Sequence, residues 1–380
     1  MIKRNISIAL PVTGDDEWQA VREPLMSGWL TQGPKVAEFE SAFAARHNAA
    51  YALAATSCTT ALHLILKAMG IGQGDEVIVP AFTWVATANV VIYCGATPIF
   101  VDVDRTTFNL DPSCLKKKLT SRTKAIIAVH LFGLCADIDA IEKAAPGIPI
   151  IEDAACAAGA RYQGRSAGIL GKAAAFSFHP RKSITTGEGG MVTTNDTFLA
   201  DMVNMLRNHG ASVSEEQRHR GPRPYILPDF NLIGFNYRMT DLQGAIGLAQ
   251  LTKLDRFIDE RHLWAAYYIR ELASIGWLRT PVTPEGYKHG WQSFVCYIDE
   301  DRAPMTRNTI MRELQERGIS TRPGTHAVHM LGLYQQKYEL TPDEYPAARD
   351  CDRFSMAIPL HNRMCKDDYE YVVAALRDLG

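Results

Sequence analysis

The sequence predicts an α/β protein with a mostly parallel central sheet flanked by helices, and a smaller α+β domain at its C-terminal end. Between residues 49 and 194, short apolar segments alternate with segments of helical periodicity, the pattern of a parallel sheet covered on both faces. Polar residues follow several of these apolar segments, where such proteins build their sites. The chain has 380 residues, which is long enough for a large core and two domains.

The N-terminal part is expected to approach this sheet through two helices. Asp15 and Asp16 can cap a helix over residues 17–26, a turn follows at 27–34, and residues 35–46 have helical spacing. The expected strands are residues 51–54, 76–80, 98–103, 125–130, 149–153, 173–178 and 190–194. The expected helices between them are residues 59–69, 84–93, 112–119 and 137–144.

The C-terminal part predicts a different organisation. After a helix that ends near Leu206, residues 210–231 are polar, contain three prolines and read as a long surface loop. Residues 239–275 form one long helical pattern that can join two domains. A strand at 293–298 and helices at 305–316 and 366–379 are expected in the smaller domain. The predicted division is therefore a large domain at 1–245 and a connecting helix with a small domain at 246–380.

Composition excludes several classes of protein. The net charge is −2, which gives no electrostatic footprint for nucleic acid or for an anionic membrane. No apolar run suits a signal peptide or a membrane span. The eight cysteines include no Cys-x-x-Cys pair and are expected to be reduced thiols. We therefore expect a cytoplasmic protein that binds neither nucleic acid nor membrane.

A lysine and an acid stand at the ends of two expected strands. Lys182 lies four residues beyond Phe178, on a polar, glycine-rich turn. Asp153 ends the apolar run that begins at Ile150, and a carboxylate buried there needs a partner. The pair suits a pyridoxal phosphate enzyme, in which the lysine forms the Schiff base and the acid pairs with the pyridine nitrogen. Taken singly, Lys182 could equally be a surface lysine and Asp153 a helix cap or a salt-bridge residue.

Two further features fit the same cofactor. Ser57, Cys58 and Thr59 open an expected helix, and a helix N-terminus with added hydroxyls suits a phosphate group. Trp84 follows another strand end and can stack on the pyridine ring. Alternatively, the Ser57–Thr59 segment could be an ordinary helix cap, and Trp84 could be a core aromatic residue. The combination of all four features in this order favours the functional one.

Two other patterns are set aside. The glycines at 70–74 follow a helix and precede a strand, which is the wrong order for a dinucleotide loop. His326 and His329 could share one side of a helix, but no acidic third ligand lies near them in the sequence, so no metal site is expected.

The sequence resembles the sugar aminotransferases of the DegT/DnrJ/StrS type, which belong to fold-type I of the pyridoxal phosphate enzymes. The resemblance covers nearly the whole chain and combines many separate motifs. They are SGWLTQGP (27–34), TTALHL (59–64), GDEVIVP (74–80), IEDAA (151–155), TTGEGG (185–190), LRNHG (206–210) and NYRM (236–239).

The resemblance implies a role for each candidate residue. Lys182 would be the aldimine-forming catalytic lysine, Asp153 would hold the ring nitrogen and Trp84 would stack on the ring. Further cofactor contacts would come from Ser57, Cys58, Thr59, Cys156, Ser177 and Asn236, the last reaching the phosphate in the neighbouring subunit of a homodimer with shared active sites. The sugar pocket would be lined by His179, Glu188, Arg238 and His326.

The chain departs from the family pattern at two cysteines. Cys58 stands where glycine is usual and leaves less room for close backbone approach. Cys156 stands where glutamine is usual, near the cofactor's ring oxygen, and a thiol is a weaker hydrogen-bond partner. Neither is expected to be catalytic. Because Lys182 is retained, the deoxygenating branch of the family, which has histidine in its place, is not favoured; His179 is three positions early for that role.

The implied function is transfer of an amino group from L-glutamate to a keto sugar on a nucleotide, with a 4-keto-6-deoxy hexose as the first choice. The product would be an amino sugar for a surface polysaccharide or a related glycan. Arg218, His219, Arg220 and Arg223 in the polar loop could bind the diphosphate, or could belong to a solvated charged loop. Two alternatives stay open: a pyridoxal phosphate dehydratase or lyase on the same fold, and a regulatory protein without enzymatic activity.

Overall fold

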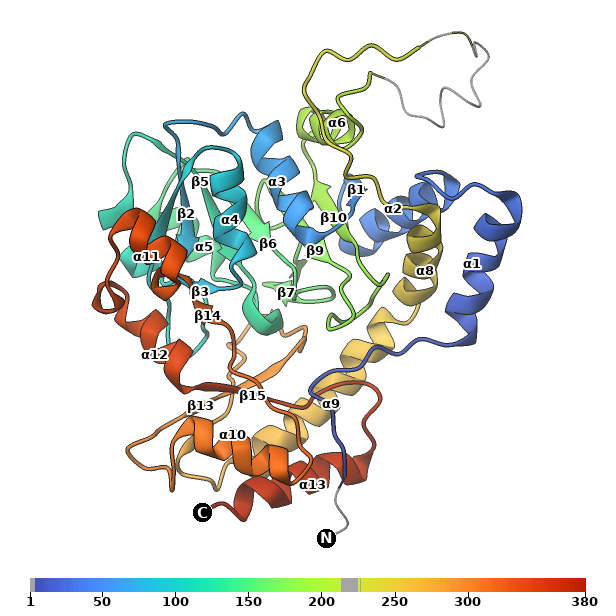
Figure 1. The fold of residues 1–380 in the computed structure, drawn as a ribbon. Helices are drawn as coiled ribbons and strands as arrows, with labels where there is room; N and C mark the ends of the chain where they lie inside the picture. The colour runs from blue at the N-terminus through green and yellow to red at the C-terminus, as the bar shows by residue number, and fades with distance from the viewer. Residues whose placement is uncertain (1–3, 213–224, 226) are drawn as a thin grey trace.

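The computed structural model describes residues 4–212, 225 and 227–380. Its centre is a seven-stranded sheet in the order β1-β10-β9-β6-β5-β2-β4 (Figure 1). The strands are β1 (Tyr51–Ala55), β2 (Glu76–Pro80), β4 (Thr97–Val101), β5 (Thr123–Val129), β6 (Ile150–Asp153), β9 (Ala173–Ser177) and β10 (Gly190–Thr194). All seven predicted strands are confirmed, with ends that differ by two residues at most.

The sheet is mostly parallel, as predicted. β4, β2, β5, β6 and β9 pair in parallel, whereas β10 runs antiparallel to both β9 and β1. Successive residues of β2 pack on opposite faces: Val77 and Val79 join one apolar cluster, and Ile78 joins the other. A strand buried on both faces must be apolar throughout, which explains its continuous apolar run.

Helices cover both faces of this sheet (Figure 1). The residues of α3 (Cys58–Ala68), α4 (Ala86–Tyr93) and α6 (Thr197–Leu206) join the first cluster. Those of α2 (Pro34–His47), α5 (Ile138–Ala144) and the beginning of α9 (Leu254–Leu272) join the second. α1 (Asp15–Ser27) and α2 both pack against α8 (Asp241–Leu251).

Two expected helices differ from the structure. Residues 112–119 form two short 3₁₀ turns, Pro112–Cys114 and Lys116–Lys118. Of this segment only Leu115 is buried, and one apolar side chain does not provide the apolar stripe that holds a surface helix. The long pattern at 239–275 is two helices, α8 and α9, separated at residues 252–253. Lys253 lies at this break and pairs with Asp16 and Glu17 of α1.

A second, smaller sheet organises the C-terminal part. It is antiparallel, in the order β11 (Leu278–Arg279), β13 (Phe294–Ile298) and β15 (Ser355–Ile358). α10 (Arg307–Glu316), α13 (Lys366–Arg377) and the later part of α9 complete a separate apolar cluster with it. The predicted strand and both predicted helices of this part are confirmed, whereas β15 was not predicted.

Two segments pack in the apolar core of the other part of the molecule, far from their neighbours in sequence. Ile6, near the N-terminus, pairs with Ile319 and lies in the C-terminal cluster. α11 (Gly332–Tyr338) and α12 (Pro346–Phe354) contribute Tyr334 and Cys351 to the core of the large sheet. The division of the chain near residue 245 stays a prediction.

Most of the predicted polar loop at 210–231 lies outside the described residues, and with it Arg218, His219, Arg220 and Arg223. Within the described ranges, every helix is too short or too polar to span a bilayer.

Candidate active site

The parallel strands bring the two candidate catalytic residues to one edge of the sheet. Asp153 is the last residue of β6, and Ser177 is the last residue of its parallel neighbour β9. Lys182 follows in a turn in which its backbone N–H donates to the carbonyl of His179 at 2.8 Å. Carboxyl ends of parallel strands are where open α/β sheets build their sites, so Asp153 and Lys182 share one site.

Asp153 is a buried carboxylate that is hydrogen-bonded but not paired with a cation. It is 6% exposed. Its Oδ2 accepts from the Thr87 hydroxyl at 2.8 Å, and its Oδ1 accepts from the backbone N–H of Ala155 at 3.2 Å. Within the described chain, no ion pair joins Asp153 to a basic side chain. A buried carboxylate in this state suits a cationic ligand group, and a protonated pyridine nitrogen is one.

Lys182 lies beside one of the two unusual cysteines. Its Nζ is 3.3 Å from Cys156 Sγ. Burial disfavours the charged amine, but Cys156 and Asp153 outweigh this effect and raise the pKa of Lys182 above its usual value. No carboxylate pairs with Lys182 in the described residues, which leaves its amine available to a carbonyl ligand.

Cys58 is a structural thiol. Its Sγ donates to the carbonyl of Ala175 at 3.4 Å and lies 3.9 Å from Asp153 Oδ1. Burial, and then the charge of Asp153, raise the pKa of Cys58 well above its usual value. The neutral thiol therefore lines the site beside Asp153, as expected for a residue without a catalytic role.

The predicted phosphate site lies where α3 begins. The Ser57 hydroxyl accepts a hydrogen bond from Thr60 N at 3.1 Å in a capping box. Ser57 therefore caps α3, as the alternative interpretation expected. The N–H groups of Cys58 and Thr59 belong to the first turn, where α-helical geometry provides no partner for them. Gly190 pairs with both Ala55 and Ser177, which places the Ser57 and Ser177 segments on either side of β10. A helix start and two nearby hydroxyls fit a phosphate group.

A side chain at Gly190 would close this site. A Cβ there would overlap the Ser57 carbonyl and Cys58 N. The glycine therefore allows β10 to approach the start of α3 closely.

Trp84 and His326 are brought together by a short strand pair. β3 (Phe82–Thr83) pairs with β14 (His326–Ala327), with Thr83 opposite His326. The rings of Trp84 and His326 are 5.7 Å apart, and Trp84 is 60% exposed. Trp84 is therefore available for stacking and is not a core aromatic. His329 is buried in a 3₁₀ turn, whereas His326 lies on β14, so the two histidines do not share a helix face.

The remaining candidates for the sugar pocket and the cofactor phosphate divide into two groups. His179 is close enough to Glu188 and Lys182 for both charges to act on its pKa, which burial lowers. Arg238 donates to Asn208 Oδ1 at 2.8 Å, and the exposed Asn236 pairs through its backbone with Asn208.

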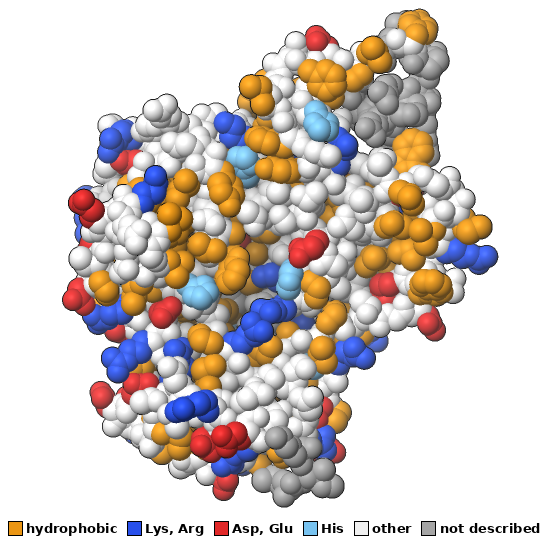
Figure 2. All heavy atoms as spheres, viewed as in Figure 1, with side chains coloured by type: hydrophobic (Ala, Val, Ile, Leu, Met, Phe, Trp, Pro, Cys, Tyr) orange, Lys and Arg blue, Asp and Glu red, His pale blue; other side chains and the backbone are white. Residues whose placement is uncertain are grey.

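Two residues of the site region were not predicted from the sequence. Thr87, which binds Asp153, lies on α4, and no local motif marks it. Arg181 immediately precedes Lys182, and its pKa is lowered by burial and then by Arg322, which is distant in the sequence. Figure 2 shows the molecule in the same view as Figure 1, with basic and histidine side chains gathered in a hollow of the visible face.

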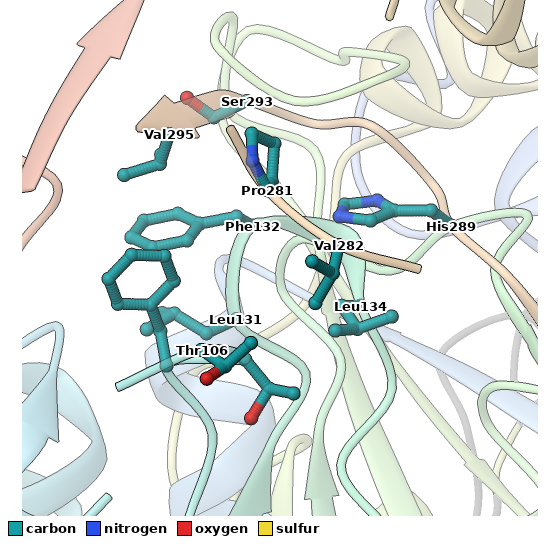
Figure 3. Close-up of a pocket in the computed structure, with 11 residues that line it drawn as sticks. Thr106, Leu131, Phe132, Leu134, Pro281, Val282, His289, Ser293 and Val295 are labelled. Atoms are coloured by element: carbon teal, nitrogen blue, oxygen red, sulfur yellow. The ribbon is translucent and has the colours of Figure 1, made fainter. Parts of the chain in front are cut away.

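Two small cavities lie near these elements. One, of about 210 Å³ including open solvent, is lined by Lys182 together with Leu10, Val12, Gln250 and Arg261, so the N-terminal segment flanks the lysine. The other, of about 250 Å³ including open solvent, is lined by Phe132, Pro281, Val282 and His289 (Figure 3). Neither Lys182 nor Asp153 lines this second cavity, and we place the chemistry at the strand ends.

Among the described residues, no group of three or more His, Cys, Asp and Glu side chains is arranged to hold a metal ion.

The fold and the lysine–acid pair define a pyridoxal phosphate-dependent aminotransferase, and comparisons agree. The family model of the DegT/DnrJ/EryC1/StrS aminotransferases matches residues 11–377. The chain belongs to this family, which confirms the predicted enzyme class and cofactor.

Three relatives illustrate the likeness. The spore coat polysaccharide biosynthesis protein SpsC of Bacillus subtilis is 40% identical, over 99% of this chain and 98% of its own. The GDP-perosamine synthase of Caulobacter vibrioides is 41% identical, over 98% and 97%. A putative sugar aminotransferase of Streptococcus pneumoniae, Spr1654, has been solved in PLP and PMP forms. It superimposes with TM-scores of 0.90 and 0.91 at 28% and 27% identity, over 99% of this chain and 98% of its own.

Proposed function

We propose that this enzyme transfers an amino group from L-glutamate to a keto sugar carried on a nucleotide, and that a 4-keto-6-deoxy hexose is the sugar. The observation that carries the proposal is the buried Asp153, which lacks a cationic partner in the described chain and shares a strand edge with Lys182. The names of the Caulobacter and Bacillus relatives support an amino sugar for a surface polysaccharide as the product.

The residues of the site fit pyridoxal phosphate. When bound, this cofactor supplies a ring that accepts the electron pair of the substrate carbon. Asp153 would hold the proton on the ring nitrogen, Trp84 would cover one ring face, and the start of α3 with Ser177 would bind the phosphate. Lys182 Nζ would then move a proton between the substrate carbon and a carbon of the cofactor. Cys156, 3.3 Å from that amine, would face the cofactor's ring oxygen.

Arg181 and Arg322 support an anionic substrate. Both are exposed, and neither forms an ion pair with a carboxylate in the described residues. Burial lowers the pKa of Arg181, and Arg322 lies close enough to lower it further. Two neighbouring guanidinium groups attract phosphate or carboxylate oxygens, which accept paired hydrogen bonds from arginine. A nucleotide diphosphate and the carboxylates of glutamate both have this chemistry.

We also propose a cytoplasmic homodimer with shared sites. Asn236 is exposed, and Phe230 and Ile233 near it are 57% and 92% exposed. Apolar side chains exposed in one segment are typical of a surface that another chain covers. Asn236 would then bind the cofactor phosphate of the neighbouring subunit.

The decisive experiment separates the two half-reactions. The enzyme loaded with pyridoxamine phosphate is mixed with a panel of nucleotide-linked 3-keto and 4-keto sugars, and the return of the pyridoxal form is followed by absorbance. A response to a 4-keto-6-deoxy sugar alone supports the proposal, and no response to any nucleotide sugar contradicts it. L-Glutamate and L-glutamine are compared as donors in the reverse step. Stoichiometric formation of 2-oxoglutarate separates amino transfer from a dehydratase or lyase, which forms none.

A further inference from the structure

We propose that Thr87 is a positioning residue for Asp153, and that Thr83 orients the Thr87 hydroxyl. The two threonines and the acid form one buried hydrogen-bond chain across three elements: β3, α4 and the end of β6. This inference rests on the proposed role of Asp153 at the ring nitrogen of the cofactor.

The distances define the chain and its direction. Thr83 Oγ1 and Thr87 Oγ1 are 3.0 Å apart, and Thr87 Oγ1 is 2.8 Å from Asp153 Oδ2. An ionised carboxylate only accepts hydrogen bonds, so the Thr87 proton points to Asp153. The Thr87 oxygen is then free to accept, and Thr83 donates to it. Thr83 and Thr87 are 1% and 0% exposed, so water does not compete for these bonds.

The chain fixes the orientation of a carboxylate that would otherwise rotate. The terminal torsion of aspartate is broad and roughly two-fold. Ala155 N–H holds Oδ1 at 3.2 Å, and Thr87 holds Oδ2 at 2.8 Å, so the carboxyl plane is fixed from both sides. The other neighbour, Cys58 Sγ at 3.9 Å, is a weak donor. Without the Thr87 hydroxyl, Asp153 Oδ2 loses its hydrogen bond and the carboxyl group is held at Oδ1 alone.

The same chain connects the acid to the elements that line the ring face. Thr83 lies on β3, directly before Trp84 and opposite His326 in the β3–β14 pair. A displacement of that strand pair would reach Asp153 through two hydroxyls. Thr87 and Thr83 therefore couple the acid at the ring nitrogen to the aromatic residue proposed for the ring face.

The test compares Thr87→Val, which keeps the shape but removes the hydroxyl, with Thr87→Ser, which keeps the hydroxyl. We expect Thr87→Val to lower kcat on the order of ten-fold, corresponding to about 1.4 kcal/mol, with little change in KM for the sugar. We also expect weaker binding of pyridoxal phosphate to the cofactor-free protein. The pH at which the absorbance of the bound cofactor changes should shift from the wild-type value, because Asp153 no longer faces the ring-nitrogen proton in a fixed orientation. Thr87→Ser should restore all three readouts to near wild type.

A matched control is Thr193→Val on β10, which removes a hydroxyl that is 0% exposed and bonds the Gly168 carbonyl at 2.7 Å. It should lower the melting temperature without moving the cofactor absorbance. Equal spectral shifts in both valine variants, or a Thr87→Ser variant as impaired as Thr87→Val, would overturn the inference. Should Thr87→Val not fold, Thr83→Val is measured instead and should shift the same readouts less; unchanged readouts there overturn the proposal.

Asp153→Asn separates this inference from the proposed function. If Asp153→Asn loses activity and cofactor affinity while Thr87→Val keeps both, only the role of Thr87 fails. If Asp153→Asn itself behaves as wild type, the proposed role of Asp153 fails, and the inference fails with it.

Discussion

At the residue scale, the site depends on buried groups with unusual partners. Asp153 is held by a hydroxyl and a backbone N–H, and Lys182 by a cysteine thiol. A buried acid and a partly buried amine without direct ion-pair partners are costly for stability, and a cofactor that binds both would offset that cost. Two predictions belong to this scale.

The first concerns Lys182. Lys182→Ala should lower turnover by at least about a thousand-fold, because it removes the group that moves the proton, and should abolish the visible absorbance of the bound cofactor. The matched control is Lys172→Ala, whose amine pairs with Asp196 at 2.6 Å on the surface. This control should keep its activity. Full activity in Lys182→Ala would end the proposed function.

The second concerns the pH dependence of stability through His361. Burial lowers the pKa of His361 to about 4. Its Nε2 is 3.0 Å from the Ser7 carbonyl, and its Nδ1 accepts from Arg363 N at 3.3 Å, so the neutral ring satisfies both contacts. The unfolded chain binds a proton near pH 6.5 and the folded chain only near pH 4. The contribution of His361 is therefore complete above pH 6.5 and is lost as the pH falls from 6.5 to 4.

By this linkage, His361 costs the native state about 2 kcal/mol between pH 7.5 and pH 5. His361→Gln can donate to Ser7 and does not titrate. Its melting temperature should therefore fall less between these two pH values than that of the wild type. His47 is also buried, with its pKa lowered to about 4, and keeps part of the dependence in both proteins. An identical fall in the two proteins would contradict the assignment to His361.

At the element scale, helix starts and strand ends converge because β10 approaches α3 closely. Gly190 makes this approach possible, since any side chain there would meet the backbone of Ser57 and Cys58. The proposed phosphate site therefore depends on a glycine that does not touch the phosphate itself. The prediction at this scale follows from that geometry.

Gly190→Ala should lower stability by about 1–3 kcal/mol, the usual cost of overpacking, and should weaken pyridoxal phosphate binding because the start of α3 must shift. Thermal melting with and without the cofactor measures both effects. Gly72→Ala is the control: its nearest neighbour is the Cys94 carbonyl at 3.9 Å from the added Cβ, so both quantities should stay near wild type. Unchanged cofactor affinity in Gly190→Ala would separate this glycine from the phosphate site.

At the scale of the whole molecule, the large sheet and the C-terminal sheet are joined by segments that cross between them. Ile6 lies in the C-terminal core, and Tyr334 and Cys351 lie in the core of the large sheet. The hollow that contains the basic side chains lies on the face shown in Figure 2. The exposed Phe230 and Ile233 near Asn236 are the basis of the proposed shared dimer.

Shared sites predict complementation between two inactive variants. Lys182→Ala and Asn236→Ala are each expected to be inactive, or nearly so, as homodimers. After unfolding and refolding together, half of the dimers are mixed, and each mixed dimer contains one intact site. Activity should therefore return to about a quarter of the wild-type value. No recovery, with dimers present by light scattering, would show that each chain completes its own site.

The sequence predicted the strands of the large sheet better than its helices or its connections. Strands buried on both faces must be apolar along their whole length, and this signal is local. The break between α8 and α9 was missed because Lys253 is held there by Asp16 and Glu17, more than 230 residues earlier. β15 was missed because its pairing with β13 is equally non-local.

By itself, the sequence predicted the class of enzyme, because the helix start at Ser57, Asp153, Lys182 and the TTGEGG segment follow one another along the chain in a recognisable order. Only the tertiary structure decided which groups surround them. Thr87 at Asp153, His326 beside Trp84 and Arg322 near Arg181 come from elements distant in sequence. The physical reason is that strand and helix signals depend on neighbours along the chain. A hydrogen bond to a buried carboxylate instead depends on how separate elements pack.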